Sequence, residues 1–239
     1  MSIADRLTAI RQRITTAAQS AGRDPSSVQL VAVSKTFPIA SVHAAYAAGQ
    51  RLFGENRVQE ALDKIAAFNP PDLRWHLLGH LQSNKAKKAA PAFAMIQSMD
   101  SVDLLQRLDR AAAEAGASPE LLIQIDLAGE ATKFGVRPEE APALFDAAGQ
   151  CQAAKVVGLM TLPPLAEQPE DARPWFRRLR ELRDGWIERG TPAGMLRELS
   201  MGMSGDFEVA VQEGATIVRV GTAIFGNRPY TNPGAAPGA

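Results

Sequence analysis

Residues 29–38 read Gln-Leu-Val-Ala-Val-Ser-Lys-Thr-Phe-Pro, an apolar segment that runs directly into a lysine. The first five residues have the length and composition of a buried strand, and Pro38 ends the element. Lys35 therefore stands partly removed from water, which disfavours its ammonium form. The neutral amine is the form that attacks an aldehyde to make a Schiff base. Taken alone, the segment more often indicates a lysine that simply extends to solvent.

Seven further strand-like segments follow, separated by helical patterns. We expect these strands at residues 51–54, 73–77, 94–97, 121–125, 155–160, 198–200 and 216–220. Helices are expected over 3–22, 39–48 and 55–68, from Ser101, from Pro138, and along a buried face of Trp175, Leu179, Leu182 and Trp186. Eight alternating strands predict an α/β fold, a single (β/α)₈ TIM-type barrel over residues 1–229 with a disordered tail at 230–239. A doubly wound open sheet is the second choice.

Composition excludes several classes of protein. The 239 residues are 46% hydrophobic, and 26 basic residues balance 26 acidic ones, so no overall charge favours nucleic acid or a membrane surface. Cys151 is the single cysteine, which fits a reducing compartment. The first residues lack a signal-peptide pattern, and no apolar run approaches the ~20 residues of a membrane span. We expect a cytoplasmic protein.

Groups suited to binding phosphate follow the last two expected strands. Residues 200–206 read Ser-Met-Gly-Met-Ser-Gly-Asp, and residues 221–226 read Gly-Thr-Ala-Ile-Phe-Gly. Each loop alone is more often an ordinary turn, but phosphate commonly binds after strands seven and eight of such barrels, through backbone N–H groups and hydroxyls. Arg219, inside the last strand, either pairs with a carboxylate or faces a ring nitrogen and keeps it unprotonated. Together with a Schiff-base lysine, these features describe a site for pyridoxal 5'-phosphate (PLP).

Seven ordered blocks of sequence resemble the pyridoxal phosphate homeostasis protein family, which shares its barrel with the N-terminal domain of alanine racemase. The blocks lie at residues 31–36, 53–60, 75–85, 133–135, 158–160, 199–206 and 218–226. The resemblance implies that Lys35 is the Schiff-base lysine and that Arg219 lies near the pyridine nitrogen of PLP. It implies that the phosphate lies among Ser200, Gly221 and Thr222, with Ser204 close to it. Asn56 and Met160 would line the wall of the pocket. His80 departs from the family, in which many members carry proline, so it receives no shared role. We interpret His76 as a structural strand residue.

The tyrosines bear on whether such a site would be catalytic. A PLP racemase needs a second base opposite the lysine, which alanine racemase takes from a tyrosine of an additional domain. Here Tyr46 falls on an expected barrel helix and Tyr230 borders the tail. We therefore expect a monomeric carrier, as the family resemblance implies, that holds PLP and supplies apo-enzymes. The alternatives are a weak PLP-dependent amino-acid racemase and a barrel enzyme that binds a phosphorylated metabolite without PLP.

Overall fold

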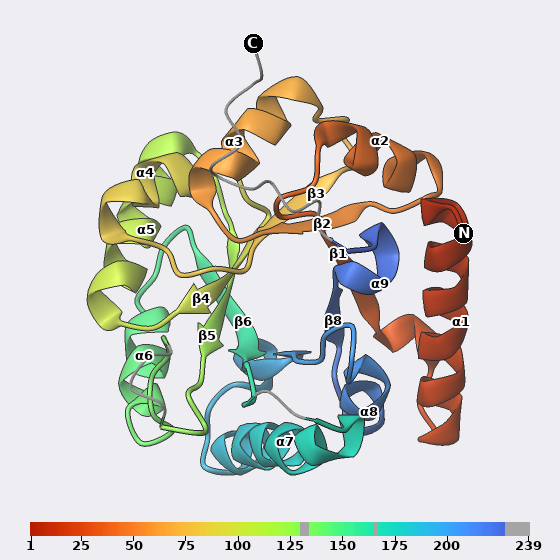
Figure 1. Ribbon diagram of the computed structural model, residues 1–239. Coiled ribbons are helices and arrows are strands. Elements are labelled where there is room, and N and C mark those ends of the chain that lie inside the picture. The colour runs from red at the N-terminus through yellow and green to blue at the C-terminus, as the bar shows by residue number, and fades with distance from the viewer. Residues whose placement is uncertain (130–133, 165–166, 228–239) are drawn as a thin grey trace.

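The computed structural model describes residues 1–129, 134–164 and 167–227. Eight parallel strands form a closed barrel in the order β1 to β8, and β8 pairs with β1 to complete the ring (Figure 1). The strands are β1 (Gln29–Val33), β2 (Leu52–Glu55), β3 (Arg74–Leu77), β4 (Met95–Met99), β5 (Glu120–Gln124), β6 (Lys155–Met160), β7 (Glu198–Ser200) and β8 (Ile217–Val220). The predicted barrel is thus confirmed, and closure rules out the open sheet.

Helices surround the barrel in Figure 1. The α-helices of the described chain are α1 (Ile3–Ser20), α2 (Ile39–Ala47), α3 (Val58–Ala67), α4 (Ala86–Ala89), α5 (Val102–Ala115), α6 (Ala141–Ala148), α7 (Arg173–Glu188), α8 (Phe207–Gln212) and α9 (Thr222–Phe225). Short 3₁₀ turns are η1 (Pro25–Ser27), η2 (Ser83–Lys85), η3 (Pro169–Ala172) and η4 (Ala193–Leu196). None of the helices in the described ranges is long and apolar enough to cross a membrane. The expected tail lies outside those ranges.

Two apolar cores hold the barrel together. The larger core fills the space between the strands and the helices, and includes Phe53, Phe176 and Phe207. A smaller one gathers strand residues in a separate cluster, Val31, Met95, Leu122, Val157, Met160 and Ile217. Because successive side chains of a strand alternate between its two faces, a barrel with helices outside buries both faces. The strands accordingly lack the alternation of polar and apolar residues that a half-exposed sheet shows.

The structure corrects three predicted helix details. The helix expected over residues 55–68 begins at Val58, because Glu55 is the last residue of β2. The helix expected to open at Pro138 begins instead at Ala141, with Pro142 in its first turn. On α7, Phe176 is buried together with Leu179 and Trp186, whereas Trp175 is only partly buried. Residue spacing alone could not show which of the neighbouring residues Trp175 and Phe176 is buried, because both fit a wide apolar stripe on the helix.

Candidate functional site

A cavity of 470 Å³ lies at the C-terminal ends of the strands, where β1, β6 and β8 give way to loops. It brings together seven of the eight predicted site residues, which are Lys35, Asn56, Met160, Ser204, Arg219, Gly221 and Thr222. Val33, Leu78, Leu162, Pro163 and Met203 supply an apolar wall, and Gly205 completes the lining. Such a cavity, mainly apolar with a few convergent polar groups, is typical of a site for a small molecule.

Lys35 reaches this cavity because β1 ends two residues earlier, at Val33. The strand is buried, whereas Lys35 itself is half-buried. Its neighbour Thr36 has a φ of 68°, in the left-handed region that a β-branched residue rarely adopts. The chain thus turns sharply at the lysine and places it at the edge of the cavity.

Hydrogen-bond donors converge on the hydroxyl oxygen of Ser204. The backbone N–H of Gly221 donates to this oxygen at 3.2 Å and that of Ala223 at 3.4 Å. The hydroxyl of Thr222 lies 3.3 Å from it. Ser204, Gly221 and Thr222 all line the cavity. Donors gathered around one oxygen at the cavity wall suit an anion with several acceptor oxygens, so these residues fit a phosphate group.

Arg219 is buried beneath the same cavity. Its guanidinium donates to the hydroxyl of Ser200 at 2.6 Å and to the carbonyl oxygen of Thr161 at 2.9 Å. Burial lowers the pKa of Arg219 to about 10, an effect that the negative charge of Asp206 opposes. The side chain therefore keeps its positive charge at neutral pH, and it is one of the residues that line the cavity.

A chain of hydrogen bonds continues from Arg219 across the barrel. Because a guanidinium only donates, the hydroxyl of Ser200 accepts from it and donates onward to Oε1 of Gln97 at 2.6 Å. The amide nitrogen of Gln97 then faces Nδ1 of His76 at 3.1 Å, which makes this ring nitrogen an acceptor. Burial lowers the pKa of His76 from 6.5 to about 4, so the ring is neutral at pH 7. The interpretation of His76 as a structural residue fits this position.

Known proteins share both the sequence and the fold. Residues 6–229 match the family described as the N-terminal domain of alanine racemase. The pyridoxal phosphate homeostasis protein of Aquifex aeolicus is 44% identical over 230 residues, which cover 96% of this chain and 100% of that protein. That of Pseudomonas aeruginosa is 44% identical over 233 residues, covering 97% and 98% of the two chains. The chain belongs to the pyridoxal phosphate homeostasis protein family.

Solved structures support the same assignment. PipY of Synechococcus elongatus with PLP bound is 45% identical, with a TM-score of 0.81 and coverage of 94% of this chain and 100% of that one. Alanine racemase of Clostridium difficile is 14% identical with a TM-score of 0.72, and the match covers 95% of this chain but 58% of that one. The racemase therefore shares the barrel fold, and it extends beyond the part that matches.

Ser200 is the predicted phosphate residue that the structure separates from the others. Its side chain is fully buried, it is not part of the cavity lining, and its hydroxyl is bonded to both Arg219 and Gln97. The contact expected between Ser200 and the phosphate stays a prediction, and the geometry favours another hydroxyl of the same loop. Ser204, four residues later in that loop, is the serine at the cavity.

Gly79 contributes to the site in a way that the sequence did not reveal. A Cβ atom at this position would lie 2.2 Å from the carbonyl oxygen of Asn56. Asn56 lines the cavity, so the two loops after β2 and β3 can approach only because residue 79 has no side chain.

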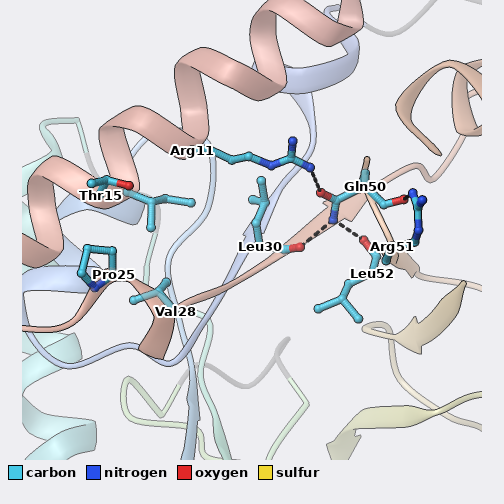
Figure 2. Close-up of a pocket in the computed structure, with 9 residues that line it drawn as sticks. Arg11, Thr15, Pro25, Val28, Leu30, Gln50, Arg51 and Leu52 are labelled. Carbon is cyan, nitrogen blue, oxygen red and sulfur yellow. Dashed lines mark hydrogen bonds between the residues drawn. The ribbon is translucent and has the colours of Figure 1, made fainter. Parts of the chain in front are cut away.

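A second cavity, of 320 Å³, lies at the opposite, N-terminal ends of β1 and β2, against α1 (Figure 2). Gln50 donates to the carbonyl oxygens of Leu30 and Leu52 at 2.7 Å and accepts from Arg11 at 3.2 Å. These paired groups connect α1 to the barrel, which is a structural role. Within the ranges that the structure describes, no group of histidine, cysteine and carboxylate side chains could hold a metal ion.

Proposed function

We propose that this chain binds PLP, holds it through a Schiff base on Lys35 and supplies it to apo-enzymes. The observation that carries the proposal is the meeting of Lys35, Arg219 and the donors around Ser204 in one cavity. The names of the two relatives and the PLP-bound PipY structure support the same ligand. A carrier needs a bond to its cargo that can be reversed, and water reverses a Schiff base.

The predicted site residues that line the cavity have roles that their positions support. Nζ of Lys35 would hold the cofactor at its aldehyde carbon with loss of one water molecule, and water would release it again. Ser204, Gly221 and Thr222 donate to phosphate oxygens. Asn56 and Met160 form part of the wall.

Arg219 argues for storage rather than catalysis. A buried cation near the pyridine nitrogen disfavours protonation of that nitrogen. PLP enzymes that form carbanions use the ring as an electron sink, and an unprotonated ring serves that purpose less well. Arg219 would therefore discourage proton abstraction even when an amino acid enters the cavity.

The composition of the cavity wall also favours storage of PLP over catalysis. Among its described residues, Lys35 and Arg219 are the ionisable ones, so the wall offers no second base of the kind that racemisation requires. The hydroxyl of Tyr46 donates instead to Asp72, at 2.6 Å. Tyr230 lies outside the described residues. We further propose that the protein works as a monomer in the cytoplasm, without nucleic acid, in keeping with its single cysteine and balanced charge.

A transfer assay tests the proposal. PLP-loaded protein is separated from unbound PLP and mixed with an apo-aminotransferase, and recovery of aminotransferase activity is followed over time. Lys35→Ala protein treated in the same way is the control. We expect activity to return with the wild-type protein only. A parallel assay measures D-alanine formed from L-alanine by the loaded protein. Rapid turnover of the amino acid without transfer of PLP would overturn the carrier function in favour of a racemase.

A further inference from the structure

The backbone just before Lys35 is held by a buried ion pair from neighbouring elements. The hydroxyl of Ser34 donates to Oε1 of Glu55, on β2, at 2.6 Å. The ammonium group of Lys64, on α3, donates to the carbonyl oxygen of Ser34 at 2.8 Å and to the same Glu55 oxygen at 2.7 Å. The hydroxyl and the backbone carbonyl of Ser34 are therefore both held by one ion pair, Lys64 with Glu55.

The backbone just after Lys35 is held by the same lysine through a second carboxylate. Nζ of Lys64 donates to Oε1 of Glu60 at 2.9 Å, and that oxygen accepts the backbone N–H of Thr36 at 2.5 Å. Thr36 has the left-handed φ of 68°. A non-glycine residue in this conformation costs about 1 kcal/mol or more, and it persists where surrounding contacts fix it. The hydrogen bond from the Thr36 N–H to Glu60 is one of the contacts that fix this conformation.

The ion pair is poorly explained as a source of stability. Lys64 is buried, and its bonds to Ser34, Glu55 and Glu60 use all three of its donors. Glu55 is fully buried, and within the described chain its Oε2 atom has no hydrogen-bond partner. Removing two charges from water is costly, and apolar replacements of such pairs are often neutral or stabilising. A positional role accounts better for its presence.

We propose that Lys64 is a positioning residue for Lys35: through Ser34 and Glu60 it fixes the backbone on both sides of the reactive lysine. The inference rests on the proposed Schiff base at Lys35. Lys64 does not line the cavity, so it acts only through the chain that carries Lys35.

The test separates Schiff-base formation from other binding. Pyridoxine 5'-phosphate carries an alcohol in place of the aldehyde, so it occupies the cavity without reacting with Lys35. We compare its dissociation constant with that of PLP in wild-type protein and in Lys64→Met. Lys87→Met is the matched control, because Lys87 is exposed and pairs with Glu114 on the surface. Glu55→Gln combined with Lys64→Met removes both buried charges, so it is the second variant to measure if the single change unfolds the protein.

We expect the dissociation constant of PLP to rise about tenfold in the Lys64 variants, the size of effect that loss of one charged hydrogen bond produces. That of pyridoxine 5'-phosphate should stay nearly unchanged, and the Thr36 amide should exchange its hydrogen faster without any ligand present. Equal weakening of both ligands, or no change in either, would overturn the positioning role. A wild-type protein that forms no borohydride-reducible adduct on Lys35 would instead overturn the proposed function.

Discussion

The guanidinium of Arg219 donates a hydrogen bond to the hydroxyl of Ser200 across 2.6 Å, and both side chains are buried. The Ser200 hydroxyl accepts this hydrogen bond and donates its own to Oε1 of Gln97, so both of these contacts are made inside the barrel. The two serines at the end of β7 and in the loop that follows it therefore have separate roles. Ser204 and Thr222 face the cavity, and Ser200 supports the residue beneath it.

Ser200→Ala should reduce stability without removing the phosphate's contribution to binding. The change leaves a buried donor of Arg219 and a buried acceptor of Gln97 unpaired, which costs about 1–3 kcal/mol of unfolding free energy. Urea denaturation measures this loss. The ratio of the dissociation constants of pyridoxal and PLP reports the phosphate's contribution, and it should match the wild-type ratio. A ratio that falls in this variant would restore Ser200 as a phosphate ligand.

Thr222→Ala and Ser204→Ala should each weaken PLP retention. Each removes one hydroxyl from the donor cluster, and a hydrogen bond to a charged group contributes about 1.5–3 kcal/mol. We expect the dissociation constant of PLP, followed by its absorbance, to rise about tenfold or more. Thr8→Ala, on the exposed face of α1, is the control. Unchanged affinity in both cavity variants would place the phosphate elsewhere.

Stability should fall as the medium becomes acidic because His76 is buried in its neutral form. The pKa of His76 in the folded state is lowered from 6.5 to about 4. The contribution of neutral His76 to the free energy of unfolding is therefore fully present above pH 6.5, and it is lost as the pH falls toward 4. The difference corresponds to roughly 3 kcal/mol. Urea denaturation between pH 7 and pH 4.5 should show a smaller acid loss in His76→Gln than in wild-type protein. The exposed His43, replaced by Gln, is the control. Identical acid sensitivity in wild-type protein and His76→Gln would contradict the account.

Gly79→Ala should damage both the fold and the cavity. The new Cβ atom would meet the Asn56 carbonyl oxygen at 2.2 Å, and backbone must move to relieve the contact. We expect a loss of about 2 kcal/mol or more in unfolding free energy, together with weaker PLP binding. Gly194→Ala is the matched control, because nothing lies within 4 Å of its added Cβ. Equal stability of the two variants would show that the loops after β2 and β3 are packed less closely than the 2.2 Å distance indicates.

Local sequence was sufficient for the barrel and for Lys35. Apolar segments of strand length, alternating with helical patterns, specify the order of elements, and the position of Lys35 follows from where the first segment ends. The chain from Arg219 to His76 could not be predicted in this way. It depends on the strand register and brings Ser200 to Gln97, 103 residues away in the sequence.

Lys64 shows a second limit of sequence reasoning. A lysine on an amphipathic helix is normally expected to point to solvent. Here Glu55 and the carbonyl of Ser34 lie where the side chain reaches, and they draw it inside. Only the packing of α3 against the ends of β1 and β2 reveals this, because none of these residues is a neighbour in sequence.

Borohydride reduction of the PLP-loaded protein, followed by peptide mass mapping, tests the central claim most directly. We predict one reduced pyridoxyl adduct, on Lys35, and none in Lys35→Ala. Lys85 and Lys155 lie outside the cavity lining, and Lys133 lies outside the described residues. A wild-type adduct on one of these three lysines in place of Lys35 would contradict the account.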